Sequence, residues 1–395
     1  MRPHRINEIL GLKIHSEKVT DILQRLGFGV SPAGSFSLQV EVPLWRGDVE
    51  REEDVVEEVA RLYGYDQIPV TLPRGELMEC REQPEQRIQD LIKHILTAAG
   101  FYEVINYSFI NPTYLRRLKL PEDDCRLKAI PLQNPLSEEQ AILRTTLLPG
   151  LLKTVQYNFN HQVGNQLIFE LGSVFLAGKL PVQEQPQERL TLALAATGKV
   201  LEPHWSIKPS PADFFTLKGA LEALFRGLGL DGAEFLSGQL PCLHPTRSAA
   251  VMIGGEQAGF VGQLHPEVAE PWDFLQEVTV CELNLERLIS WVNLVPGYTA
   301  LPRYPATLRD IAVIAPLELP AAELELCIRE AGGELVEQVS LFDVYQGGQI
   351  PAGKRSLAFA IRYRSPEKTL TDEQANRIHQ QIIEALSAKG ALLRE

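Results

Sequence analysis

The chain has 395 residues, of which 45% are hydrophobic and 23% are charged, so it has ample apolar material for several domains of about 100–200 residues each. Its 38 basic and 51 acidic residues give a net charge of −13, which excludes a uniformly basic nucleic-acid-binding protein and confines any RNA contact to a local basic surface. No apolar run approaches the roughly 18 residues of a membrane span, and polar residues follow the first few positions, so we expect a cytoplasmic protein with no membrane partner.

The cysteines predict neither a disulfide framework nor a structural zinc site. Their number is odd, they lie far apart, and no Cys-x-x-Cys pair occurs. We interpret them as reduced, mostly buried thiols. They are Cys80, Cys125, Cys242, Cys281 and Cys327.

Two proline-containing segments, at 69–84 and 296–305, interrupt the hydrophobic pattern and divide the chain into blocks 1–70, 71–300 and 301–395. In the first block, Ser16 is predicted to cap a helix that Gly27 ends, residues 37–42 alternate like a strand, and 52–62 form a further helix. This order predicts a winged-helix-like module. Because it lacks a basic recognition face, a structural role is favoured over DNA binding, and no DNA partner is expected.

The middle block opens with an amphipathic helix that begins near Pro84 and ends before Gly100. A second helix is predicted over 217–225. The strand-like runs between and after them are 103–110, 167–175, 190–196, 249–253 and 278–283. Strands grouped between a few helices predict an α+β domain with a mostly antiparallel sheet.

The C-terminal block reads as strand 310–314, helix 321–331, strand 335–342, strand 357–363, a last helix and strand 391–394. The last helix carries a complete start signal, with Thr371 as N-cap and Gln374 closing a capping box, and Gly390 follows its end. The order βαββαβ predicts a ferredoxin-like domain.

Four carboxylates near the start of the predicted helix 52–62 form a candidate metal site. Asp54, Glu57 and Glu58 share one face of that helix, and Asp48 lies shortly before it. Converging carboxylates repel unless a cation separates them, and ligation by oxygen alone suits Mg²⁺ or Ca²⁺. The alternative is an acidic first turn that satisfies the helix dipole.

Two other patterns are interpreted as structural. The Gly-x-Gly-x-x-Gly match at Gly227, Gly229 and Gly232 follows a helix and not a strand, so it predicts a helix end and a turn. His244 and His265 each precede a proline, with no carboxylate spaced as a metal partner, and are interpreted as loop or core residues.

A basic group in the C-terminal block is the candidate RNA contact. Basic side chains gather on or beside one predicted strand, with aromatic residues nearby, and such a surface can follow an RNA backbone. The alternative is a solvated sheet face. The residues are Lys354, Arg355, Arg362 and Arg364, with Tyr345 and Tyr363.

Together these motifs resemble the C-terminal half of the bacterial-type phenylalanyl-tRNA synthetase beta subunit. The resemblance covers nearly the whole chain. It is carried by residues 46–48 and 52–66; by 134–137, 143–144, 147–152 and 169–172; by 213–215, 217–219, 244–245, 259, 262 and 265–266; and by 304–305, 309–310, 342–345, 353–357, 369–372, 390–391 and 393–394.

The resemblance implies a noncatalytic class II synthetase-like core, because 278–288 lacks the glycines that let a nucleotide approach the backbone. No catalytic residue is therefore expected in this chain. The implied Mg²⁺ ligands are Asp48, Asp54, Glu57 and Glu58, and the implied C-terminal domain binds the anticodon stem of tRNA(Phe).

The implied partner is a catalytic alpha subunit in an alpha2beta2 ligase that joins phenylalanine to tRNA(Phe) with ATP. Family members carry OB-like and editing modules before this region, and we expect this polypeptide to lack them and their proofreading. The alternative is a stand-alone tRNA-binding or regulatory paralogue without a ligase partner.

Overall fold

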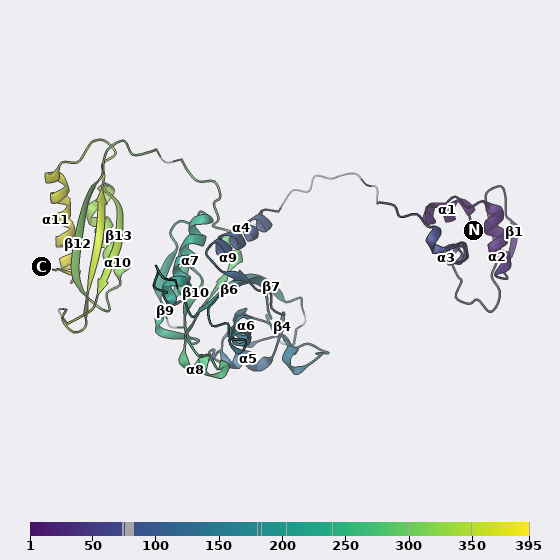
Figure 1. Ribbon diagram of the computed structural model, residues 1–395, viewed down its shortest axis with the longest axis horizontal. Helices are drawn as coiled ribbons and strands as arrows, with labels where there is room; N and C mark the ends of the chain where they lie inside the picture. Colours follow the sequence, from purple (N-terminus) through teal and green to yellow (C-terminus); the bar gives the residue numbers. More distant parts are fainter. Residues whose placement is uncertain are drawn as a thin grey trace. The chain divides into compact units, whose positions relative to one another are not determined.

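The computed structural model describes residues 1–395 apart from 73–74, 76–82, 180, 183, 203, 239, 299, 349 and 395. The chain divides into two units, Met1–Gln83 and Pro84–Glu395 (Figure 1). Within the described ranges, no helix is both long and apolar enough to cross a membrane. Cys80 lies outside the described residues, Cys125 is exposed, and Cys242, Cys281 and Cys327 are buried free thiols.

The first unit packs helices around a small core and adds a two-stranded hairpin. Its elements are α1 (Pro3–Leu10), α2 (Ser16–Arg25), β1 (Gly29–Pro32), β2 (Leu38–Glu41), α3 (Glu52–Tyr63) and the 3₁₀ turn η1 (Tyr65–Gln67). The strands pair antiparallel, with Gly29 opposite Glu41. The helices bury apolar side chains such as Val19 and Val59 in one cluster.

The predicted end of α2 is confirmed and its predicted cap is wrong. Gly27 has a φ of +86°, which glycine adopts without strain. Ser16, however, is the first helical residue, and His15 stands at the N-cap position without a side-chain hydrogen bond. The N-cap is the residue just before the first helical one, and Ser16 lies one position inside the helix, so it does not occupy the capping position.

Within the described residues, the second unit contains a seven-stranded sheet in the order β3-β6-β7-β11-β10-β9-β8. Only β3 and β6 pair parallel, which confirms the predicted mostly antiparallel sheet. Its strands are β3 (Tyr102–Glu103), β6 (Gln166–Leu176), β7 (Gln187–Thr197), β8 (Glu234–Ser237), β9 (Leu243–Ile253), β10 (Glu256–Leu264) and β11 (Val278–Asn284).

Helices cover both faces of this sheet. On one face α4 and α7 pack with the sheet in one cluster, and on the other α6 packs in a second cluster (Figure 1). Burial on both faces explains the unbroken apolar run of β7, in which Leu192 and Ala193 point to opposite clusters. The helices are α4 (Pro84–Ala98), α5 (Pro112–Arg117), α6 (Leu148–Asn160), α7 (Phe214–Gly227), α8 (Pro266–Ala269) and α9 (Leu285–Ile289).

The predicted strand over 103–110 is corrected. It is broken into β3 and β4 (Phe109–Ile110), and among the described strands β4 pairs with the short β5 (Ile142–Leu143) alone. Between them the backbone of Asn106 is bound by side chains, because its N–H donates to Glu170 and its carbonyl accepts from Arg144. Side chains from distant segments replace the ladder bonds that a continuous strand would make.

The three glycines and two histidines that the sequence suggested to be structural lie at a helix end, in a strand and at a helix start. Helix α7 ends at Gly227, and Gly229 and Gly232 follow with φ of +64° and +77°. His244 lies in β9, and the Nδ1 atom of His265 accepts the backbone N–H of Glu267 at the start of α8. These positions confirm the helix end and give His265 a capping role.

The C-terminal block has the predicted βαββαβ order. Its elements are β12 (Thr307–Pro316), α10 (Ala321–Gly332), β13 (Val336–Tyr345), β14 (Lys354–Tyr363), α11 (Asp372–Ala388) and β15 (Leu392–Leu393). The sheet order is β13-β14-β12-β15, and all pairs are antiparallel. The Thr371–Gln374 capping box of α11 is confirmed. Both helices pack on one face of the sheet, around residues such as Phe359 and Ile382.

Candidate functional site

The four predicted metal ligands do not converge. Arg46 lies between two of them: its guanidinium donates to Asp48 at 2.7 Å and to Glu58 at 2.9 Å. Arg61 also pairs with Glu58, which is buried. Asp54 instead accepts the backbone N–H groups of residues 50 and 51 at 2.9 and 2.7 Å, and Glu57 is exposed.

Hydrogen bonds from Arg46 and from backbone N–H groups at the start of α3 stabilise the ionised form of three of these carboxylates. Hydrogen bonds from Arg46 lower the pKa of Asp48 to about 2 and also lower the pKa of Glu58. Backbone N–H groups lower the pKa of Asp54. In the part of the chain that the structure describes, no three acidic, histidine or cysteine side chains gather where a metal ion could bind. As arranged, the group does not fit Mg²⁺, because Arg46 already neutralises two of its members.

The C-terminal sheet leaves the face opposite α10 and α11 open. Alternate residues of β14 are buried against the helices, and those between them, including Lys354 and Arg362, lie on the open face. Small residues at 356, 358 and 360 separate the two cations along β14. Tyr345 pairs in register with Ser356, next to Lys354. We call this surface the open sheet face.

Sequence reasoning missed Arg394 as a member of this face. Its guanidinium lies 5.4 Å from the centre of the Tyr345 ring and donates to the hydroxyl of Ser356 at 3.3 Å. Only the pairing of β12 with both β14 and β15 brings the last residues of the chain here.

Two members of the predicted basic group are held within the protein. Arg355 donates to the carbonyl of Leu319 at 2.9 Å. Arg364 pairs with Glu337 at 2.9 Å and donates to the carbonyl of Tyr304. Lys354 and Arg362 thus lie near opposite ends of β14 on the open face, with Tyr345 beside the Lys354 end. Arg355 and Arg364 have internal partners, and Arg362 lies 3.9 Å from Glu337.

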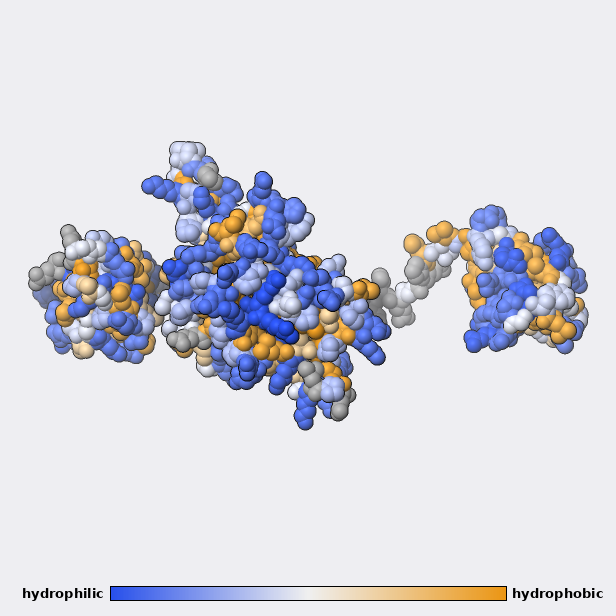
Figure 2. All heavy atoms as spheres, turned by 90° about the horizontal axis from the view of Figure 1, so that it is seen from below, coloured by the Kyte–Doolittle hydropathy of each residue, from blue (hydrophilic) through white to orange (hydrophobic). Residues whose placement is uncertain are grey.

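An exposed apolar strip runs beside α6 in the second unit. Tyr107 is 77% exposed, Phe109 41% and Tyr157 62%, and all three line one cavity of about 290 Å³. Neighbouring Ile105 is 90% exposed. Figure 2 shows hydrophobic residues scattered among hydrophilic ones on the surface of each part of the chain. Contiguous exposed apolar residues are typical of interaction surfaces.

A buried ion pair positions this exposed apolar strip. Arg144 and Glu170 are 7% and 2% exposed and lie 2.6 Å apart. Both bind Asn106, whose side chain donates to Glu170 at 2.7 Å and accepts from Thr154 on α6 at 2.8 Å. Asn106 is thereby fixed between the exposed residues 105 and 107.

Family models match three successive segments of the chain. The phenylalanyl tRNA synthetase beta chain CLM domain matches residues 68–285, the tRNA synthetase B5 domain matches 1–65, and the ferredoxin-fold anticodon binding domain matches 302–394. The last match agrees with the βαββαβ sheet and helices described above.

Curated relatives named phenylalanine–tRNA ligase beta subunit are similar over nearly all of this chain. The protein of Symbiobacterium thermophilum is 43% identical over 93% of this chain and 41% of its own length. Those of Moorella thermoacetica and Geobacter sulfurreducens are 41% and 37% identical over 100% of this chain and 49% of their own lengths. The chain thus spans about half the length of the curated relatives it matches.

A solved structure of pyrrolysyl-tRNA synthetase from Desulfitobacterium hafniense is similar at a TM-score of 0.40, with 17% identity over 51% of this chain and 67% of that chain. The family model over residues 68–285, with its flanking matches, is decisive: the chain belongs to the phenylalanyl-tRNA synthetase beta-chain family.

Proposed function

We propose that this chain is a noncatalytic component of a phenylalanine–tRNA ligase. In this role it holds a catalytic alpha subunit and binds tRNA(Phe), while the alpha subunit joins phenylalanine to the tRNA. The observation that carries the proposal is the succession of three family domains over one chain. The assembly we expect is alpha2beta2.

The open sheet face supports the tRNA part of the proposal. Lys354 and Arg362 supply positive charge for the phosphate backbone, and Tyr345 with Arg394 supplies a flat surface. This local basic surface reconciles RNA binding with a chain whose net charge is −13. Arg355 and Arg364, which the sequence also suggested, act in our proposal by holding the loops at Leu319 and Tyr304.

The exposed apolar strip supports the alpha-subunit part. Its aromatic side chains are of the kind enriched in protein interfaces, and they are held by a buried network that keeps their backbone in one position. We therefore propose that the alpha subunit docks on Ile105, Tyr107, Phe109 and Tyr157.

We also propose that Asp48, Asp54, Glu57 and Glu58 bind Mg²⁺ in the assembled ligase. Their oxygen-only donor set is the supporting observation. In the arrangement described, a cation at Asp48 and Glu58 has to displace Arg46 from both carboxylates.

Co-purification with an alpha-type subunit, followed by an aminoacylation assay, tests the proposal. The full chain should capture the alpha subunit, and the mixture should charge tRNA(Phe). The double variant Tyr107→Ser/Tyr157→Ser should lose capture, whereas Tyr298→Ser, which changes a tyrosine of 92% exposure outside the strip, should retain it.

The outcomes separate the alternatives. If the chain binds tRNA and captures no alpha subunit at low salt, it is a stand-alone tRNA-binding or regulatory protein. If the strip variants capture the alpha subunit as well as the parent does, the docking surface lies elsewhere on the chain.

A further inference from the structure

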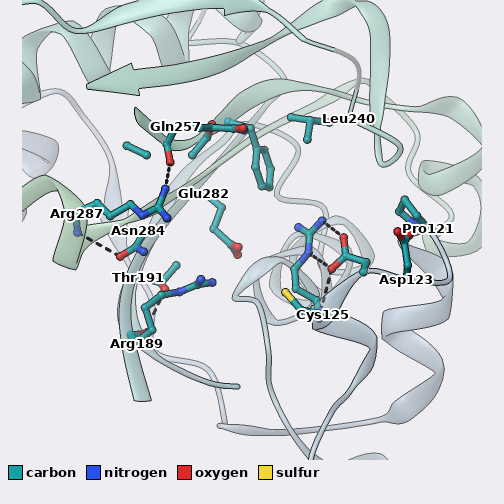
Figure 3. Close-up of a pocket in the computed structure, with 15 residues that line it drawn as sticks. Pro121, Asp123, Cys125, Arg189, Thr191, Leu240, Gln257, Glu282, Asn284 and Arg287 are labelled. Atoms are coloured by element: carbon teal, nitrogen blue, oxygen red, sulfur yellow. Dashed lines mark hydrogen bonds and ion pairs between the residues drawn. The ribbon is translucent and has the colours of Figure 1, made fainter. Parts of the chain in front are cut away.

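A cavity lined mostly by charged and polar residues opens over the seven-stranded sheet, away from both the open sheet face and the exposed apolar strip. It measures about 570 Å³, within the range of about 300–1,000 Å³ typical of small-molecule sites. Its walls come from the 121–126 segment and from β7, β10, β11 and the start of α9 (Figure 3).

Glu282 extends into this cavity from β11 and is 6% exposed (Figure 3). Its Oε2 atom accepts the hydroxyl of Thr146 and, at 2.9 Å, the N–H of Leu147. Both donors are neutral. Among the described residues, Oε1 accepts no hydrogen bond and no cation lies within ion-pair distance of the carboxylate.

Glu170 shows what a fully satisfied carboxylate looks like in the same sheet. It lies in the same row as Glu282, on the other side of Ala193. Its two oxygens accept from Arg144 and Asn106, and Arg144 supplies a positive charge at 2.6 Å. Burying a carboxylate without a neighbouring cation is costly in free energy. Oε1 of Glu282 is therefore free to accept a hydrogen bond from a bound ligand, and its negative charge favours a cationic or polar N–H donor.

Two arginines that line the cavity have no carboxylate partner among the described residues. Arg189 forms no ion pair with any described residue, and its buried Nε atom has no hydrogen-bond partner there. Among the described residues, the guanidinium of Arg287 has one hydrogen-bond partner, the carbonyl of Gln257 at 2.7 Å. Asn284 between them uses its side-chain oxygen to cap α9. Figure 3 shows these three side chains grouped on one side of Glu282.

The remaining arginine of the cavity is already satisfied. Arg126 forms two hydrogen bonds to Asp124, at 2.7 and 3.0 Å, and its guanidinium lies over the ring of Phe260 at 5.9 Å. It therefore closes one wall. The unmet groups are a carboxylate oxygen at the centre and two guanidinium groups beside it.

We propose that this cavity binds a small anion that also carries an N–H donor. The anionic group, a carboxylate or a phosphate, lies against Arg189 and Arg287, and the N–H donor binds Oε1 of Glu282. A nucleoside monophosphate with an exocyclic amine and a free α-amino acid both have this chemistry. The proposed contacts are made by side chains and not by close approach to the backbone, so the lack of glycines in 278–288 excludes neither ligand. The ligand is bound and is not converted.

Calorimetric titration of the purified full chain tests the proposal. The probes are AMP, purine riboside 5′-monophosphate, which lacks the exocyclic amine, L-phenylalanine and inorganic phosphate. We expect AMP or L-phenylalanine to saturate one site. Arg189→Ala and Glu282→Gln should each weaken that binding about tenfold or more, the effect of losing one charge-assisted hydrogen bond.

Two further variants keep the test independent of folding. Arg287 is exposed, so Arg287→Ala should weaken binding without lowering the melting temperature. Arg226→Ala removes an exposed arginine of α7 that does not line the cavity and should leave binding unchanged.

The proposal is overturned if neither AMP nor L-phenylalanine binds at millimolar concentration, or if Arg189→Ala and Arg287→Ala bind as the parent does. If purine riboside 5′-monophosphate or phosphate alone binds as tightly as AMP, the role given to Glu282 is wrong. None of these measurements involves an alpha subunit or tRNA, so the result is independent of the proposed ligase function.

Discussion

Glu170 and Glu282 flank Ala193 in one row of the seven-stranded sheet, and a single segment, residues 144–147, binds both carboxylates. It offers Glu170 the guanidinium of Arg144 and offers Glu282 only a hydroxyl and a backbone N–H. One carboxylate is thereby built into the scaffold, and the other is left facing a cavity.

Replacing Arg144 by Met should lower the free energy of unfolding by about 3–5 kcal/mol, because Glu170 then stays buried without a cation. The double variant Arg144→Met/Glu170→Leu should recover part of this loss. Urea unfolding of the full chain measures both. Arg329→Ala, which breaks an exposed pair with Glu325, should cost about 0.5 kcal/mol or less. Equal losses of unfolding free energy at both sites would contradict the larger contribution expected from the buried pair.

Arg46→Ala should raise the affinity of the chain for Mg²⁺, because it frees Asp48 and Glu58 for a cation. Asp54→Ala/Glu57→Ala should lower it. Equilibrium dialysis with elemental analysis gives the occupancy, and Asp21→Ala, which removes an exposed carboxylate paired with Lys18, is the matched control. Unchanged occupancy in the double variant would leave the acidic group with its ion-pair and capping roles alone.

Lys354→Ala and Arg362→Ala should each weaken tRNA binding and reduce the slope of log affinity against log salt by about 1, the effect of one lost phosphate contact. Lys389→Ala removes the same charge at the exposed C-terminal end of α11 and should leave the slope unchanged. Filter binding at several salt concentrations measures the slope. A slope that responds equally to all three changes would remove the open sheet face from the tRNA site.

Arg355→Ala should affect stability more than the salt dependence of tRNA binding, because its guanidinium is bound to the carbonyl of Leu319. This contrast with Lys354→Ala separates two neighbouring cations that the sequence treats alike. The same binding and unfolding measurements apply to both.

The C-terminal core should lose stability in mild acid. The Nδ1 atom of His379 and the hydroxyl of the buried Tyr363 form a hydrogen bond of 3.0 Å. Burial, together with the charge of Arg309, lowers the pKa of His379 below its ordinary 6.5. The unfolded chain therefore takes up a proton below about pH 6.5 that the folded chain resists, so stability falls as the pH decreases from 6.5 toward the folded-state pKa.

Amide hydrogen exchange of β14 in the full chain, compared at pH 5.5 and 7.5 after correction for the intrinsic rate, measures this loss. His379→Gln keeps a polar partner for Tyr363 and does not titrate, so its protection should depend less on pH. An equal pH dependence in parent and variant would assign the loss to other groups.

Local structure was readable from the sequence at several places where one segment supplies all the partners, although the cap predicted at Ser16 was wrong by one position. The Thr371–Gln374 capping box, the glycine after α2 and the alternation of β14 were predicted, because each depends on residues a few positions apart. The order of such elements was sufficient for the βαββαβ domain. The family, too, followed from motifs that lie in order along the chain.

Only the tertiary structure decided which charged side chains contact one another. Arg46 and Glu58 were both visible in the sequence, yet their pairing depends on how the loop before α3 folds back on that helix. Arg394 reaches Tyr345 through the order of strands in the sheet, and Arg144 and Glu170 meet across 26 positions and replace a predicted strand at Asn106. A charge acts through space over a few ångströms, whereas sequence spacing reports distance only within one helix or strand.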